Sequence, residues 1–139
     1  MNDMKTLLIC GSARSIVATK DHVEEIWSLA QNPVEFSDRL YGFHGEQNAT
    51  HSWKRSMPND AILNTGLPLG NTICIMLVNA IVEDRFSEIR ILGSPLSVGP
   101  EYTKERPLLA VCVWYCRNIA RIQCYWEGGP ELAKTYMFQ

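Results

Sequence analysis

Hydrophobic residues in this chain gather in short runs that end in glycine, serine, proline or charged residues. A short apolar run bounded by such turn residues is typical of a β-strand. Runs of this kind predict strands over residues 5–10, 39–45, 60–66, 88–93 and 122–126.

Other stretches carry a helical pattern. Residues 19–30, TKDHVEEIWSLA, have apolar side chains at helical spacing and acidic residues near the expected N-terminus. Residues 69–86 are apolar on nearly every side, which is typical of a helix buried against a sheet. Residues 106–121 predict a third helix, with Pro107 in its first turn, where the missing N–H costs nothing. A short helix is expected over residues 48–55.

Strands that alternate with helices predict an α/β fold in which a mainly parallel sheet is covered by helices. A chain of 139 residues that is 46% hydrophobic has the size and the apolar content of one domain. We therefore expect a single Rossmann-like domain over residues 1–129, followed by a C-terminal arm or short helix over residues 130–139.

The charge balance excludes several partners. The 13 basic and 15 acidic residues are mixed along the chain and give a net charge of −2, so no global field attracts DNA or RNA. No apolar stretch approaches the roughly 20 residues that span a bilayer, so we expect a cytoplasmic protein without a membrane partner. The chain has five cysteines, which is an odd number, and most of them lie in apolar runs. We therefore expect them to be reduced core residues: Cys10, Cys74, Cys112, Cys116 and Cys124.

Two segments repeat one pattern directly after a predicted strand. Residues 9–15, ICGSARS, and residues 92–97, LGSPLS, both place Gly-Ser-x-x-Ser at the end of an apolar run. If the two strands are neighbours, both loops face the same crevice at the carboxyl ends of the strands, where parallel sheets bind ligands. The alternative is that Gly-Ser is a common way for a chain to leave a strand.

The residues of these two loops suit a phosphate group. Glycine allows close approach of the backbone, exposed N–H groups form an anion-binding nest, and serine adds a hydroxyl donor. Arg14 adds a planar, charged contact. The ligand-binding candidates here are Gly11, Ser12 and Arg14 in the first loop, and Gly93, Ser94, Pro95 and Leu96 in the second. A plain turn with a solvated arginine remains the alternative.

Further candidates lie in two other segments. In residues 64–72, NTGLPLGNT, Thr65 and Gly66 form a small turn, and Asn71 stands at a helix start, where its alternative role is that of an N-cap. Tyr102 is placed to stack on a base and Arg106 to contact phosphate or ribose. Because the residue before a proline avoids the helical region, Arg106 favours a loop over the alternative of a solvated helix start.

His44 and Glu46 are the candidates for acid-base chemistry. The two side chains stand close in the sequence FHGEQ, and the alternatives are a polar contact with a ligand and a structural or surface role. Three histidines in the whole chain, at spacings that match no zinc pattern, predict no metal site, and we expect no cofactor.

Five stretches together resemble a group of small phage-encoded Rossmann-like proteins, which are distantly similar to pterin diphosphokinases and sialyltransferases. The resemblance covers residues 5–126 and is carried by LLICGSARS, DRLYGFHGEQNATHSWKR, TGLPLGNTICIMLVNAI, EIRILGSPL and GPEYTKERPLLAVCVWYCRNIARIQCYW. It implies a Rossmann-like fold, with the second-strand region shortened to VEFSD (34–38). Gly93 precedes Ser94 and Pro95, where enzymes of the wider group carry an aspartate, which argues against their transferase chemistry here.

These observations favour a protein that binds a nucleotide-derived small molecule without transforming it. The phage-like resemblance extends this to an anti-defence role, in which the protein sequesters a cyclic-nucleotide or ADP-ribose-type immune signal of its host. The alternative is a phosphodiesterase or a glycosyl or nucleotidyl transferase with His44 and Glu46 as acid and base.

A third hypothesis is an interaction module. Aromatic residues are abundant toward the C-terminus, and such residues are enriched at subunit interfaces, so we expect a homo-oligomer. The residues concerned are Trp114, Tyr115, Tyr125, Trp126, Tyr136 and Phe138.

Overall fold

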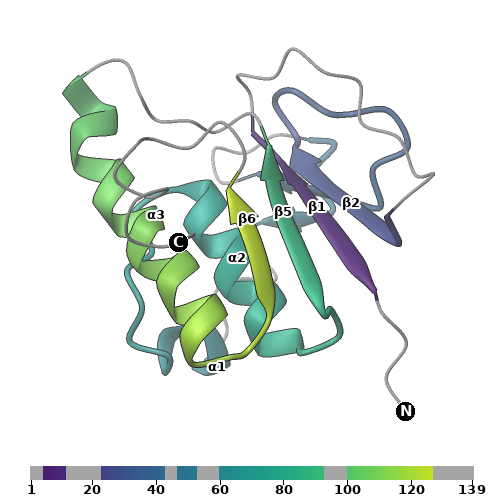
Figure 1. Cartoon of the computed structure of the whole chain (residues 1–139). Coiled ribbons are helices and arrows are strands. Elements are labelled where there is room, and N and C mark those ends of the chain that lie inside the picture. Colours follow the sequence, from purple (N-terminus) through teal and green to yellow (C-terminus); the bar gives the residue numbers. More distant parts are fainter. Residues whose placement is uncertain (1–4, 12–22, 43–46, 53–59, 93–99, 127–139) are drawn as a thin grey trace.

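The chain folds into a six-stranded, all-parallel sheet with helices packed against it (Figure 1). The computed structural model describes residues 5–11, 23–42, 47–52, 60–92 and 100–126, and for residues 100–104 the backbone alone. The elements are, in chain order, β1 (Thr6–Cys10), β2 (Glu25–Leu29), β3 (Arg39–Gly42), β4 (His51–Ser52), α1 (Asp60–Leu63), α2 (Thr72–Glu83), β5 (Glu88–Leu92), α3 (Pro100–Asn118) and β6 (Gln123–Trp126). The strand order is β4-β3-β2-β1-β5-β6, which confirms the predicted Rossmann-like α/β fold.

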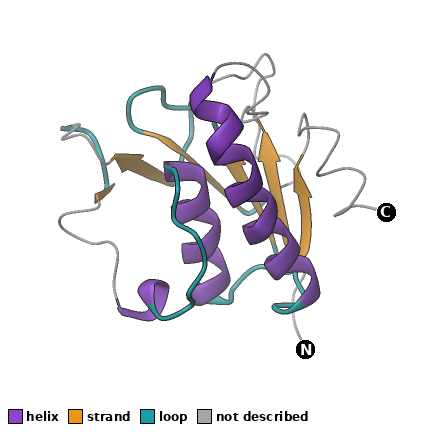
Figure 2. Ribbon diagram, turned by 90° about the vertical axis from the view of Figure 1, so that its left-hand side faces the viewer, coloured by secondary structure: helices purple, strands orange, loops and turns teal. Residues whose placement is uncertain are grey.

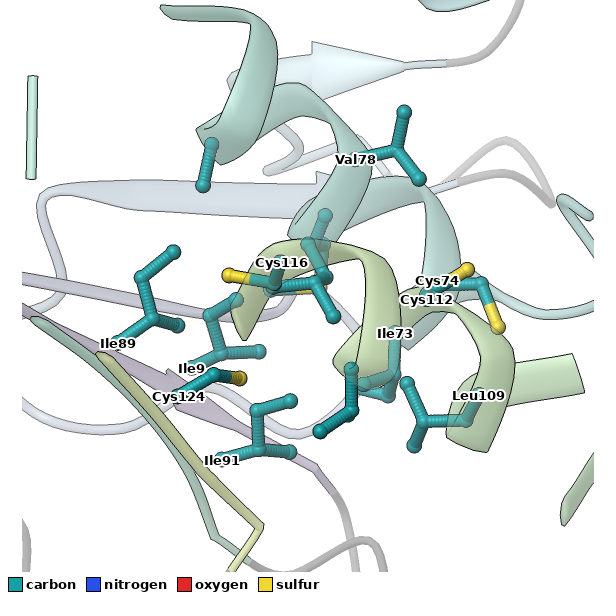
Figure 3. Packing of buried hydrophobic residues seen from close by; sticks show 14 of the residues in the cluster. Ile9, Ile73, Cys74, Val78, Ile89, Ile91, Leu109, Cys112, Cys116 and Cys124 are labelled. Carbon is teal, nitrogen blue, oxygen red and sulfur yellow. The ribbon is translucent and has the colours of Figure 1, made fainter. Parts of the chain in front are cut away.

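The three described helices pack on one face of the sheet (Figure 2). Alternate residues of the central strands point into this layer, among them Leu7 and Ile9 of β1 and Ile89 and Ile91 of β5 (Figure 3). A smaller cluster lies on the opposite face and consists of Leu8, Cys10, Ile26 and Val34, with Val23 and Leu92 packed against it. Both faces of β1 are therefore buried, as a central parallel strand requires.

α2 is buried because its sequence is apolar on all sides. Residues 73–80 are all buried between the sheet and the neighbouring helices. Asn79 is the one polar residue among them. The helix ends at Asp84, which adopts a left-handed conformation with a φ of 54° and donates its N–H to the carbonyl oxygen of Ala80. The predicted helix over residues 69–86 is confirmed.

The helix predicted over residues 19–30 is wrong, because residues 25–29 form strand β2. Trp27 and Leu29 pack against the helix layer, while Ile26 and Ser28 lie under the loop of residues 30–38. A strand covered on both faces has an unbroken apolar sequence, so the helical spacing within it carries no information. Residues 34–38, expected as a shortened second strand, belong to this loop instead.

Two short elements were also assigned wrongly. Residues 60–63 form helix α1 where a strand was predicted, and residues 51–52 form edge strand β4 where a short helix was predicted. Elements of four and two residues are too short for a hydrophobic period to identify.

α3 begins at Pro100, so Pro107 lies inside a 19-residue helix rather than in its first turn. Pro100 takes the first helical position, where a proline is favoured. Tyr102 and Arg106 therefore belong to a helix, and the prediction of a loop at Arg106 is wrong. Within the described part of the chain, no helix is long and apolar enough to cross a membrane.

All five cysteines are among the described residues, and all five are buried. The expectation that they are core residues is confirmed. Cys10 lies on the face opposite the helices, and the other four belong to the main core between the sheet, α2 and α3.

Candidate functional site

The order of strands reverses between β1 and β5. β1 pairs with β2 on one side and with β5 on the other, and the last residues of the two neighbours, Cys10 and Leu92, lie side by side. The two Gly-Ser loops therefore leave the sheet from adjacent strand ends. The prediction of a shared crevice required these two strands to be neighbours, and they are.

Gly11 closes the junction between the two strands. Its backbone N–H donates to the carbonyl oxygen of Leu92, the last residue of β5, at 2.7 Å, which extends the β1–β5 pairing one residue beyond β1. Gly11 itself is buried. Ser12 and Gly93, the next residues in the sequence, thus each follow a residue of this hydrogen-bonded pair.

The chain connections on the two sides of this junction pass over opposite faces of the sheet. The loop of residues 30–38 connects β2 to β3 across the face opposite the helices. In this loop the Val34 N–H donates to Ser28 Oγ, and the Val34 side chain packs near Ile26. The connections into and out of β5 run through α2 and α3 on the helix face (Figure 2). In open parallel sheets, ligands bind where the connections that leave two adjacent strands diverge to opposite faces. Most of the connection that leaves β1, residues 12–22, lies outside the described residues.

α2 and α3 both begin at this same edge of the sheet (Figure 1). Helix N-termini present unpaired N–H groups and a positive partial charge, which suit an anion. At α2, however, the Asn71 side chain accepts a hydrogen bond from the N–H of Cys74 at 2.8 Å. The alternative role of Asn71 as an N-cap is therefore confirmed.

The turn before α2 is fixed by packing. A Cβ atom at Gly70 would lie 2.1 Å from Cδ1 of Leu108 on α3, so the glycine lets this turn dock directly on the neighbouring helix. Gly70 thus has a structural reason to be glycine.

Thr65 and Gly66 lie elsewhere. The Thr65 hydroxyl donates to the carbonyl oxygen of Ile62 at 2.8 Å and accepts from the N–H of Leu67 at 3.2 Å, and Gly66 has a φ of 71°. Both residues follow α1, which lies near the end of the sheet where the strands begin (Figures 1 and 2). The structure does not bring them to the carboxyl ends of β1 and β5.

Most of the other predicted site residues fall outside the described ones: Ser12, Arg14, His44, Glu46, Gly93, Ser94, Pro95 and Leu96. Tyr102 lies in the first turn of α3, with only its backbone described, and Arg106 lies in the following turn with a half-buried side chain. The roles assigned to these residues stay predictions.

Sequence reasoning missed a polar cluster on the helix face of β3. Arg39 forms a two-armed ion pair with Glu83 of α2, donates to the hydroxyl of Tyr41 at 3.2 Å, and lies 4.4 Å above the ring of Trp27. Asn79 donates to the same Tyr41 hydroxyl at 2.7 Å and to Glu83 at 3.0 Å. The sequence feature that could have indicated this cluster is Asn79, a single amide within the apolar part of a predicted helix.

Burial and charge shift the ionisation of this cluster. Burial raises the pKa of Tyr41 to about 12, so its hydroxyl stays protonated at neutral pH. Burial also raises the pKa of Glu83, but hydrogen bonds from Arg39 and Arg85 outweigh it and hold that pKa below its usual value. His51 stacks on Tyr41 with ring centroids 4.9 Å apart, and burial followed by the charge of Arg39 lowers its pKa.

These polar groups bind one another, which indicates a structural role. Arg39, Asn79 and Glu83 join the last turns of α2 to β3. Among the described residues, no group of three or more His, Cys, Asp or Glu side chains is placed to hold a metal ion.

Comparisons with known proteins add no family. No family model matches the chain, and no curated protein or solved structure is significantly similar to it. The parallel α/β architecture is therefore what the fold establishes, and the relation to phage-encoded Rossmann-like proteins stays a prediction from the sequence.

Proposed function

We propose that the protein binds a nucleotide-derived small molecule in the crevice at the carboxyl ends of β1 and β5. The observation that carries the proposal is the reversal of strand order at this pair, with Gly11 hydrogen-bonded to Leu92 at the point where both Gly-Ser loops begin. In open parallel sheets, ligands bind at such a point.

A phosphate-bearing ligand fits the composition of this edge. The two loops contribute glycines, serine hydroxyls and Arg14, and the N-termini of α2 and α3 lie at the same edge of the sheet. Backbone N–H groups and one arginine suit a diphosphate or a cyclic phosphate better than they suit an uncharged metabolite. The nucleotide class follows from the resemblance to Rossmann-like proteins.

The proposed outcome of binding is sequestration. The resemblance to phage-encoded proteins supports a role in which the protein withholds a cyclic-nucleotide or ADP-ribose-type immune signal of the host. In the part of the chain that the structure describes, the polar cluster around Arg39 is hydrogen-bonded within itself at the contact between β3 and α2.

A thermal-shift panel tests the proposal. The panel contains mono-, di- and cyclic nucleotides, NAD, ADP-ribose derivatives and nucleotide sugars. A ligand at 100 times its Kd should stabilise the fold by about 2.7 kcal/mol, which is easily seen as a rise in Tm. Each ligand that binds is then released by heat and examined by chromatography. Intact ligand supports sequestration, whereas a product favours the enzymatic alternative with His44 and Glu46.

Two variants locate the binding site. Arg14→Ala should weaken binding of the ligand about tenfold to a hundredfold, because a hydrogen bond to a charged group contributes roughly 1.5–3 kcal/mol. Lys5→Ala is the matched control, since Lys5 is an exposed cation at the opposite end of β1. Equal affinities of the two variants for the ligand would place the site elsewhere, and no shift with any ligand would refute the proposal.

A further inference from the structure

Four buried thiols form two pairs around α3. Cys74 of α2 faces Cys112 of α3, and Cys116 of α3 faces Cys124 of β6 (Figure 3). Cys74 and Cys112 shift each other's pKa, and Cys116 raises the pKa of Cys124, so the two thiols of each pair lie close together. Proximity of two sulfurs from different elements is the first requirement for a disulfide.

The surroundings of Cys74 favour its thiolate. The residue lies in the first turn of α2, three positions after the N-cap Asn71, and its backbone N–H donates to Asn71 Oδ1 at 2.8 Å. The neighbouring Cys112 thiol and then backbone groups of Asn71 and Gly70 lower the pKa of Cys74, despite its burial and the charge of Glu105. A thiolate at a helix N-terminus is the nucleophilic form of cysteine. The neighbouring Cys74 thiol and burial raise the pKa of Cys112, which therefore keeps its proton.

The loop of residues 66–70 lies against this pair. The Cys112 thiol donates to the carbonyl oxygen of Pro68 at 3.3 Å, so the sulfur faces the backbone of this loop. This loop is half-exposed, and Gly70 is exposed. Both thiols have no exposed surface in the closed fold, and a loop of this kind opens at a lower free energy than the core does. The Cys116–Cys124 pair lies instead between α3 and β6, where the Cys116 thiol and then burial raise the pKa of Cys124.

We propose that Cys74 and Cys112 are an oxidation site, at which hydrogen peroxide produces an intramolecular disulfide that ties the first turn of α2 to α3. The Cys74 thiolate attacks one peroxide oxygen, the O–O bond breaks, and a proton completes the water that leaves, so that Cys74 becomes a sulfenic acid. The Cys112 sulfur then attacks the Cys74 sulfur, an S–S bond forms, and the sulfenic oxygen leaves as a second water with the Cys112 proton. Two thiols lose two electrons to one peroxide. The site does not depend on the ligand proposed above.

Mass spectrometry of the full chain tests this site. Reduced protein is treated with hydrogen peroxide, quenched in acid, alkylated with N-ethylmaleimide under denaturing conditions, and weighed intact before a peptide map is made. We expect three of the five cysteines to be alkylated and one crosslinked peptide that joins Cys74 to Cys112. Because the map is made on the unaltered protein, the result does not depend on whether a variant folds.

Serine variants separate the two pairs. Cys74→Ser and Cys112→Ser should each abolish the crosslink, and Cys112→Ser should leave Cys74 as a sulfenic or sulfinic acid. Cys116→Ser, the control from the second pair, should keep the Cys74–Cys112 crosslink. Five alkylated cysteines at a peroxide dose that oxidises glutathione, a crosslink between Cys116 and Cys124, or a disulfide between two chains would each overturn the inference.

Discussion

Arg39 joins two strands and a helix through one guanidinium group. It pairs with Glu83 on α2, donates to Tyr41 in its own strand and lies over Trp27 of β2, and its side chain is 20% exposed. Arg90 repeats the same kinds of contact at the surface: one hydrogen bond to Glu88 at 2.9 Å, a distance of 5.9 Å to the ring of Tyr125, and a side chain that is 44% exposed. The two arginines differ mainly in burial and in the number of contacts.

Arg39→Gln should therefore destabilise the protein by about 2–3 kcal/mol, because it leaves Glu83 half-buried without its main partner. Arg90→Gln should cost less than about 1 kcal/mol, as is usual for an exposed ion pair. Urea unfolding of both variants measures the difference in the free energy of unfolding. Similar losses for the two would show that the Arg39 cluster does not hold α2 against β3.

At the scale of single elements, sequence pattern was reliable where an element was long or clearly bounded. β1, β3, β5, β6 and α2 all form within the predicted ranges. β2 was mistaken for a helix because it is covered on both faces, so its apolar sequence has no period of two. α3 was started too late because Pro107 resembles an N-terminal proline, while Pro100 holds that position.

Asn71 offers a test of an element boundary that bears on the site. Asn71→Ala should lower the free energy of unfolding by about 1 kcal/mol through loss of the cap on α2, whereas Asn71→Asp should retain it. Because its side-chain oxygen already accepts from Cys74 N–H, the neutral cap variant Asn71→Ser should leave ligand affinity unchanged. A loss of affinity in Asn71→Ser without loss of stability would return this residue to the binding site.

Only part of the candidate site could be predicted from the sequence. The repeated Gly-Ser pattern indicated which two loops to compare, but it could not indicate that their strands are neighbours. Strand order depends on how α2 and α3 pack on one face, which no local pattern records. The Arg39–Glu83 pair was missed because its members are 44 positions apart and each, taken alone, is an ordinary charged residue.

For the whole molecule, His51 couples stability to pH. Among the described residues, the groups that face it are Tyr41, Thr50, Arg39 and Glu83, and burial together with the Arg39 charge lowers its pKa in the folded state. The unfolded chain therefore binds a proton more readily than the folded one, so stability is lost as the pH falls through the ordinary histidine pKa of about 6.5 toward the lower folded value.

His51→Phe keeps an aromatic ring over Tyr41 and removes the titration. The free energy of unfolding of the natural protein should fall between pH 7 and pH 5, and His51→Phe should fall less over the same interval. Denaturant melts at several pH values measure both profiles, with pH 4 avoided because Glu83 and other carboxylates begin to titrate there. Identical slopes for the two proteins would assign the dependence to another group.

The pairing of β1 with β5 also fixes the order in which the molecule can fold. Thr6 contacts Glu88, 82 positions away, whereas β1 finds β2 within the first 29 residues. During synthesis from the N-terminus, one edge of β1 thus stays open until β5 has left the ribosome, and an open strand edge is a template for pairing with another chain. Slow closure of such long-range contacts is the rule for parallel sheets. The carboxyl ends of β1 and β5 consequently meet late, and the nascent chain is most prone to aggregate before they do.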